Sequence, residues 1–216
     1  MACGLPDVPC GVFTVNTVGG PCGERPNAAG HPTVLVVDDE KSVADVQALT
    51  LRDAYETRVA YGGEEAMAKY DDAVDAVVLD RRMPDLHGDE VLARIRERGD
   101  DTVVVMMTAV DPELNILEME FDDSLTKPVD AETLRSALDR LLNTRREGDP
   151  RLTEFFSLVS KLEILESELP AGELADSEEY ADVKRRAREL GEELEETHPD
   201  FEEIVETFRE INRGSP

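Results

Sequence analysis

Short apolar runs alternate with amphipathic stretches between residues 31 and 142. The strongest runs are apolar at consecutive positions, which is typical of strands buried on both faces of a parallel sheet. These runs are Thr33–Val37, Ala76–Leu79 and Val103–Met107, and weaker strand candidates lie at Glu56–Ala60 and Leu125-Thr126. The remaining stretches predict helices over Val43–Arg52, Glu64–Tyr70, Asp89–Arg98, Pro112–Met119 and Ala131–Leu142. Five such units predict an α/β domain with a doubly wound, five-stranded parallel sheet.

The pattern changes after residue 142. Residues 143–150 are polar and predict a linker, whereas residues 151–216 have the three- and four-residue spacing of amphipathic helices. One apolar stripe stops at Pro170 and consists of Leu152, Phe155, Val159, Leu162, Leu165 and Leu169. A second has the heptad spacing of a coiled-coil seam and consists of Tyr180, Val183, Ala187, Leu190 and Leu194. We expect a small all-α helical hairpin or coiled-coil module, with a new helix starting at Pro199 rather than one kinked helix.

The first thirty residues are rich in glycine, proline and asparagine and predict a disordered N-terminal extension, residues 1–30. Cys3, Cys10 and Cys22 lie there without the close ligand pairs of a zinc site, so neither a metal site nor a disulfide framework is expected there. The N-terminus lacks the pattern of a signal peptide. No apolar run approaches the roughly 20 residues of a membrane helix. The sequence therefore predicts a cytoplasmic protein without membrane contact.

The composition is strongly acidic, with 50 Asp+Glu against 23 Lys+Arg and a formal net charge of −27. Only five of the basic residues are lysine. This composition favours a halophilic protein, because concentrated salt screens the self-repulsion of a dense carboxylate surface. An ordinary acidic protein from a GC-rich genome is the alternative. Residues 31–142 carry −15 and residues 151–216 carry −11, so no segment has the basic footprint of a nucleic-acid-binding domain.

Polar residues follow the predicted strands, namely Asp38, Asp39, Asp80, Thr108 and Lys127. The carboxyl ends of the strands border the active crevice of an open α/β sheet, so these side chains should converge. Clustered carboxylates repel one another unless a cation joins them, and a partly open site with hard oxygen ligands suits Mg²⁺. The hydroxyl and the ammonium group could hold the oxygens of a phosphoryl group, and an aspartate that attacks phosphorus would form an aspartyl phosphate.

Four motifs carry these residues: VVDDE (36–40), VVLDRRMPDLHG (77–88), MMTA (106–109) and TKP (126–128). Together they resemble the receiver domain of two-component response regulators, which has a flavodoxin-like fold, over about half of the chain. The resemblance implies that Asp80 is the phosphoacceptor. It further implies that Asp39, Asp80 and the backbone carbonyl of Arg82 bind Mg²⁺ directly, while Asp38 acts mostly through a bound water.

The same resemblance assigns the other two strand-end residues. Lys127 would pair with the phosphoryl oxygens, and Thr108 would swing in to hydrogen-bond them. Pro128 resembles the family's proline, whose peptide bond is often cis. One position departs from the family pattern: Ser124 replaces the usual aromatic residue three positions before the lysine. Its absence puts the usual aromatic switch in doubt, and we expect a weaker phosphorylation-driven change at this position.

Residues 151–195 resemble the HalX extension of haloarchaeal response regulators, which implies no established chemistry. Three interpretations of this segment compete: a hairpin for partner binding or homodimerisation, a DNA-binding output module, and a structural cap on the receiver. The basic cluster at residues 184–188 could contact phosphates, or it could form helical ion pairs such as Arg186 with Asp182 and Arg188 with Glu192. No basic helix-turn-helix pattern is visible, so a protein partner or a dimer ranks first.

The sequence as a whole predicts a response regulator that a sensor histidine kinase phosphorylates, rather than an enzyme with turnover of its own. The receiver is expected to assist its own phosphorylation and dephosphorylation. A non-phosphorylated adaptor is one alternative, which the intact set of five strand-end residues disfavours. A Mg²⁺-dependent phosphatase is another, but it would need a cap or substrate pocket that this short domain cannot supply.

Overall fold

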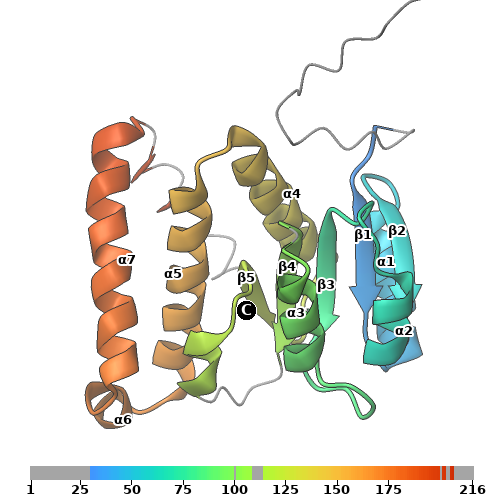
Figure 1. Cartoon of the computed structure of the whole chain (residues 1–216), viewed down its shortest axis with the longest axis horizontal. Coiled ribbons are helices and arrows are strands. Elements are labelled where there is room, and N and C mark those ends of the chain that lie inside the picture. The colour runs from blue at the N-terminus through green and yellow to red at the C-terminus, as the bar shows by residue number, and fades with distance from the viewer. Residues whose placement is uncertain (1–29, 100, 109–113, 200, 203–204, 207–216) are drawn as a thin grey trace, which may run out of the picture.

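The computed structural model describes residues 30–99, 101–108, 114–199, 201–202 and 205–206. Its centre is a five-stranded parallel sheet in the order β2-β1-β3-β4-β5 (Figure 1). The strands are β1 (Thr33–Val37), β2 (Glu56–Ala60), β3 (Ala76–Asp80), β4 (Val103–Thr108) and β5 (Asp123–Thr126). All four neighbouring pairs are parallel. The predicted doubly wound α/β fold is therefore confirmed.

Helices cover both faces of the sheet, as the continuously apolar strands require. The helices of the sheet domain are α1 (Lys41–Leu51), α2 (Gly63–Lys69), α3 (Gly88–Glu97) and α4 (Ala131–Glu147). Side chains of α1 and α4 share one buried core with alternate residues of the strands, such as Val36 and Val78. Side chains of α2 and α3 share another with the opposite residues, such as Leu35 and Met106.

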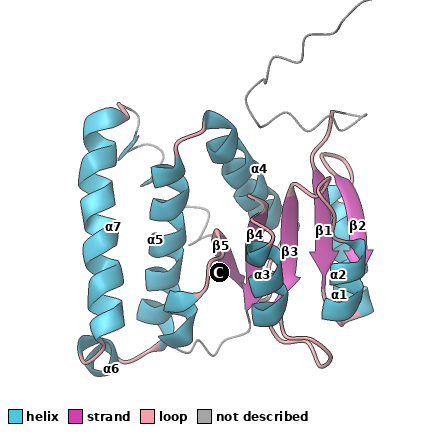
Figure 2. Ribbon diagram, in the orientation of Figure 1, coloured by secondary structure: helices cyan, strands magenta, loops and turns pink. Residues whose placement is uncertain are grey.

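The C-terminal helices are α5 (Pro150–Glu168), α6 (Ala171–Ala175) and α7 (Glu178–Thr197). Helices α5 and α7 lie side by side next to the β5 end of the sheet (Figures 1 and 2). Between them, Leu152, Phe156, Leu190 and Leu194 form part of a buried cluster of the hairpin. Leu162, Leu165 and Tyr180 instead extend the core of the sheet domain. The expected all-α hairpin is present, and it packs on the receiver-like domain.

The expected linker at residues 143–150 is wrong for most of its length. Helix α4 continues to Glu147, because residues 143–147 contain no helix breaker and the side chain of Thr144 is buried. Gly148 then ends the helix with a left-handed φ of 77°. Asp149 caps α5 at once, and Pro150 occupies its first turn, where the missing N–H is tolerated.

The predicted helix over Pro112–Met119 is not an α-helix in its described part. The described part of this crossover is a 3₁₀ helix, η1 (Leu114–Glu118), and Pro112 lies outside the described residues. Ile116 and Leu117 are buried, and both α5 and α7 contact η1. The hairpin thus covers η1 on this side of the sheet.

The predicted break before Pro199 is confirmed, because α7 ends at Thr197 and His198 is extended. Residues 201–202 and 205–206 are helical again, while Ile204, Phe208 and Ile211 lie outside the described residues. So do residues 1–29, on which the expected disordered extension falls. Within the described part of the chain, no helix has the length and apolar character needed to cross a bilayer.

Candidate functional site

The loop after β1 presents two carboxylates at the carboxyl edge of the sheet. Asp38 is buried, and its Oδ1 accepts a hydrogen bond of 2.9 Å from the backbone N–H of Glu40. The backbone N–H of Asp38 donates to the carbonyl of Ala60 at 3.2 Å, which anchors the loop to β2. Asp39 is exposed. The Asp38 carboxylate is therefore fixed by a backbone hydrogen bond, while the Asp39 carboxylate reaches solvent.

Asp80 is the last residue of β3, next to β1 in the sheet, and its side chain is buried. The loop after it turns back onto its backbone at Gly88. A Cβ atom at position 88 would lie 2.4 Å from the carbonyl oxygen of Asp80, so only glycine allows this approach. The Gly88 N–H closes the loop by donating to the carbonyl of Arg81 at 2.9 Å.

Lys127 follows β5 and brings a positive charge to the two buried carboxylates. Its Nζ lies 2.7 Å from Oδ2 of Asp38 and 2.8 Å from Oδ1 of Asp80. Its backbone N–H donates to the carbonyl of Thr108 at 2.7 Å. The Lys127–Pro128 peptide bond is cis, as the family resemblance implies. The ends of β1, β3, β4 and β5 thus meet at one site.

Carboxylate oxygens of Asp38, Asp39 and Asp80 all lie within 4.8 Å of one another. This donor set fits Mg²⁺, which prefers hard oxygen ligands and keeps several waters in a partly open site. Zinc is disfavoured, because this group offers no histidine or cysteine.

Burial raises the pKa of the Asp80 carboxyl above its ordinary value, and the negative charges of Asp38 and Asp39 add to this rise. The hydrogen bond and charge of Lys127 oppose it. Burial alone would lower the pKa of Lys127, but its hydrogen bonds with Asp38 and Asp80 outweigh burial and raise it. Lys127 therefore stays protonated at neutral pH and partly offsets the repulsion among the carboxylates.

The structure brings together four of the predicted site residues by contact or ligand distance: Asp38, Asp39, Asp80 and Lys127. Thr108 ends β4, beside the strand of Asp80, and is buried. Its hydroxyl makes no hydrogen bond to these four residues in the described structure. Arg82 lies two residues after Asp80 with an exposed side chain, and the role of its carbonyl as a ligand stays a prediction.

The sequence of residues 34–139 matches the family model described as the response regulator receiver domain. Residues 34–139 form a receiver domain. Residues 144–211 match a second model, described as the HalX domain. The receiver and HalX models meet where α4 runs on past residue 142, which agrees with the absence of a long linker.

A Haloferax volcanii protein named "Putative transcriptional regulator" is 43% identical over 159 residues, which are 73% of this chain and 27% of that protein. The sensory transduction protein RegX3 of Mycobacterium tuberculosis is 38% identical over 122 residues, 54% of this chain and 52% of its own. The chain thus spans about half, or less, of the length of these relatives. The match to RegX3 shows that this receiver is homologous to those of two-component regulators.

Solved structures agree on the fold. The signal receiver domain of a Vibrio parahaemolyticus protein superposes with a TM-score of 0.50 at 26% identity, covering 54% of this chain and 93% of its own. A CheY-like receiver domain protein of Methanospirillum hungatei also gives 0.50, at 22% identity, covering 55% of this chain and 99% of its own. These structures cover the receiver domain and not the HalX helices.

The sequence analysis missed Arg81, which directly follows the candidate phosphoacceptor. Its guanidinium is largely buried and lies 3.1 Å from Oδ1 of Asp89 in α3, and it donates to Oδ1 of Asn115 in η1 at 3.0 Å. Arg81 therefore joins the Asp80 loop to the crossover that the HalX helices contact. The sequence does not indicate this role, because nothing in it distinguishes the buried Arg81 from the exposed Arg82.

The heptad seam of α7 is buried within the chain, at Tyr180, Ala187, Leu190 and Leu194, because α5 packs against it. Burial of this seam therefore does not require a second copy of the chain.

The basic cluster forms ion pairs, but not the predicted ones. Arg185, rather than Arg186, pairs with Asp182 at 2.8 Å. Arg186 reaches across to Glu154 of α5 at 2.8 Å, and Lys184 to Glu166 at 2.8 Å. The expected pair of Arg188 with Glu192 is not among the ion pairs of the described residues. Three of the four cations thus have carboxylate partners.

Proposed function

We propose that Asp80 accepts a phosphoryl group from a phosphohistidine of a sensor histidine kinase. The observation that carries this proposal is the position of Asp80: a buried carboxylate at the end of β3, 2.8 Å from the ammonium of Lys127 and within a triad of carboxylates that fits Mg²⁺. A solvated surface aspartate would have neither the cation nor the enclosure.

In the proposed transfer, a carboxylate oxygen of Asp80 attacks phosphorus, the P–N bond to the imidazole breaks, and the imidazole nitrogen keeps the bonding electron pair. Lys127 already lies at the Asp80 carboxylate and would pair with the phosphoryl oxygens afterwards. The Thr108 hydroxyl, one strand away, would donate a hydrogen bond to them. Water attack on phosphorus later releases inorganic phosphate and restores the carboxylate.

Asp39, Asp80 and the carbonyl of Arg82 would hold Mg²⁺, with Asp38 acting through a bound water. The ion would supply positive charge that offsets the repulsion between the carboxylates and the incoming phosphoryl oxygens. The chain's own part is to hold these oxygens in place: the N–H of Glu40 fixes Asp38, and Gly88 lets the loop after Asp80 close.

On this proposal the chain is a stoichiometric phosphoacceptor in the cytoplasm, not an enzyme, although it assists its own phosphorylation and dephosphorylation. Its output would come from protein contacts made by the HalX helices. DNA binding is a second candidate, favoured by the name of the Haloferax volcanii relative. The pairing of Lys184, Arg185 and Arg186 with carboxylates counts against it.

The test is the intact mass of the full chain after incubation with acetyl phosphate and Mg²⁺ in concentrated KCl. We expect one added phosphoryl group, loss of this addition in Asp80→Asn, and loss of it when EDTA replaces Mg²⁺. Asp72→Asn, at an exposed position remote from the triad, is the matched control and should be phosphorylated like wild type. Phosphorylation that persists in Asp80→Asn would refute the assignment.

A further inference from the structure

Strand β5 is an edge strand of the sheet, since it pairs only with β4 in the observed strand order. Edge strands expose backbone groups that invite pairing, and proteins commonly cover them. Here α5 lies alongside β5 and separates it from α7 (Figure 1). The cover of the receiver's open edge is therefore the first helix of the chain's own C-terminal hairpin.

The contact centres on two serines. The backbone N–H of Ser124 in β5 donates to Oγ of Ser160 in α5 at 3.1 Å, and the two hydroxyls lie 3.1 Å apart. Ser124 and Ser160 are 5% and 1% exposed, so no water competes for this contact. A side chain larger than serine at position 124 would meet the helix. The missing aromatic residue thus has a structural reason: α5 occupies the space beside it.

Charged and aromatic groups flank the two serines. Asp123 is fully buried and forms an ion pair with Arg140 of α4, whose guanidinium lies 5.0 Å from the ring centre of Phe156 in α5. Just before β5, the carbonyl of Phe121 accepts a hydrogen bond of 2.5 Å from the Ser157 hydroxyl of α5. Hydrogen bonds and the cation–π contact are directional, so together they fix the position of α5 along β5.

The same strand reaches the phosphorylation site. Ser124 is in register with Met106 of β4, and Thr126 is in register with Thr108. Side chains two residues apart on a strand point to the same face. The Thr108 side chain therefore lies on the sheet face that carries Ser124. It is two residues along the strands from the contact with α5. Lys127, which holds Asp80, comes directly after this strand.

A second connection runs through Arg81. Its guanidinium donates to Asn115 of η1, and η1 is in contact with both α5 and α7. A change in the loop after Asp80 would thus reach the hairpin at a second point. Neither route needs the aromatic side chain that this receiver lacks.

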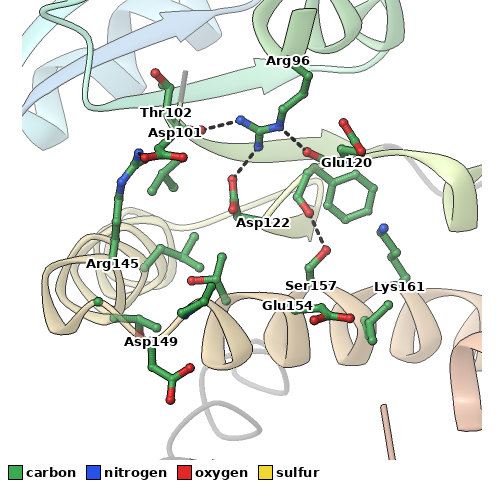
Figure 3. Close-up of a pocket in the computed structure, with 18 residues that line it drawn as sticks. Arg96, Asp101, Thr102, Glu120, Asp122, Arg145, Asp149, Glu154, Ser157 and Lys161 are labelled. Carbon is green, nitrogen blue, oxygen red and sulfur yellow. Dashed lines mark hydrogen bonds and ion pairs between the residues drawn. The ribbon is translucent and has the colours of Figure 1, made fainter. Parts of the chain in front are cut away.

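One part of the interface is hollow. A cavity of about 670 Å³ opens between the receiver and α5, next to the Ser157 contact (Figure 3). Arg96 closes its receiver side by binding Asp122 and the carbonyl of Glu120. Lys161 of α5 is buried at the other side and lies over the Phe121 ring, 5.2 Å from its centre. The cavity leaves α5 unpacked over part of its length, whereas Leu162 and Leu165 anchor the helix in the core of the sheet domain.

We infer that the β5–η1 surface of the receiver is a docking site for the chain's own helices α5–α7, and that phosphorylation of Asp80 weakens this docking through the Ser124–Ser160 contact. The coupling rests on the proposed function, whereas the docking does not. Drawing Thr108 and Lys127 towards a phosphoryl group moves the ends of β4 and β5, and a serine–serine hydrogen bond has a narrow range of productive distances.

A disulfide trap tests the docking in the full chain. Ser124→Cys and Ser160→Cys are combined after Cys3, Cys10 and Cys22 are replaced by alanine. Since the two hydroxyl oxygens are 3.1 Å apart, the sulfurs should need little movement to bond. The control pairs Ser124→Cys with Ser167→Cys, an exposed site on α5 that lies about two helical turns further along the helix. We expect rapid cross-linking of the first pair and not of the second; equal rates would overturn the docking.

The coupling is read from the same variant. Acetyl phosphate with Mg²⁺ should slow cross-linking about fivefold or more, and by reciprocity the oxidised variant should be phosphorylated less at a given donor concentration than the reduced one. Unchanged cross-linking in a chain whose mass shows the phosphoryl group would overturn the coupling. A chain that gains no phosphoryl group would instead refute the proposed function, and the disulfide trap would still decide the docking.

Discussion

The carboxyl edge of the sheet and the β5 edge differ in how their residues are brought together. At the carboxyl edge, each site residue ends a strand or lies within two residues of its end, so a single topological rule brings them together. At the β5 edge, the contacts join different kinds of element, such as Ser124 of a strand and Ser160 of a helix. The first region can be recognised from short motifs. The second exists only because a helix packs beside the receiver.

The two regions also differ in how charge is handled. The site concentrates three carboxylates, and burial with mutual repulsion raises the pKa of Asp80. The hairpin disperses its charges in ion pairs, and the hydrogen bonds from Lys184 and Tyr180 lower the pKa of Glu166. The site is thus arranged for an additional cation, whereas Lys184, Arg185 and Arg186 of the hairpin already have carboxylate partners. Four changes would break or sharpen this contrast.

The largest effect is expected at Lys127. Lys127→Gln would leave Asp38 and Asp80 buried without their cation, and removing one partner of a buried pair typically costs about 3 kcal/mol or more. Urea unfolding without Mg²⁺ should show this loss, and Mg²⁺ should recover part of it by supplying a cation. Lys41→Gln, at an exposed position, is the control and should lose little. Equal losses of unfolding free energy in the two variants would show that Lys127 does not offset repulsion between the carboxylates.

The second-largest effect is expected for Ser124→Tyr, which places an aromatic residue where most receivers have one. Because α5 fills the space there, the ring would overpack the contact, and overpacking costs about 2 kcal/mol. We expect lower stability and a more exposed α5 by limited proteolysis. Ser167→Tyr places the same ring at an exposed position near the C-terminal end of α5 and should be nearly neutral. A stable, fully docked Ser124→Tyr would mean that the serine is not dictated by the helix.

A smaller effect is expected from salt. The −27 charge repels itself in dilute buffer, and the Debye length falls from about 10 Å at 0.1 M to about 3 Å at 1 M salt. The melting temperature should rise by about 3 °C or more between these KCl concentrations, which corresponds to about 1 kcal/mol. A flat or falling melting temperature would reject a salt-adapted surface.

The smallest effect concerns the hairpin's ion pairs. Since the folded-state pKa of Glu166 is lowered, its contribution is present above its ordinary pKa and is lost as pH falls through the lowered value. Both Glu166 and Lys184 are about half exposed, so solvent screening limits the effect of Glu166→Gln to about 0.5 kcal/mol. Urea unfolding at neutral and acid pH should show this small difference vanishing in acid. A difference that grows in acid would contradict the sign.

The extent to which the sequence predicts the structure follows the same contrast. The strands, their parallel arrangement and the meeting of four of the five strand-end groups were predictable. Buried parallel strands are continuously apolar, and their carboxyl ends meet at one edge of the sheet. The 3₁₀ helix η1, which α5 and α7 contact, and the full length of α4 were not. Thr144, for example, is polar in sequence yet buried in α4.

The contact between Ser124 and Ser160 could not be predicted from the sequence either. Ser160 and Lys161 lie between two residues of the apolar stripe of α5, and only the structure shows that both are buried. Nothing in the sequence names Ser124 as the partner of Ser160. The departure from the family pattern at position 124 and the polar residues of α5 explain each other only once they are seen in contact.

The measurement that tests the link between the two regions most directly is amide hydrogen exchange of the full chain, with and without Mg²⁺ and beryllofluoride as a phosphoryl mimic. Slower exchange in the loop at residues 81–88 would show that the mimic is bound at Asp80. With the loop protected in this way, we predict faster exchange in the α5 peptide that contains Ser157 and Ser160. Unchanged or slower exchange of that peptide, with the loop protected, would contradict a docking contact that phosphorylation weakens.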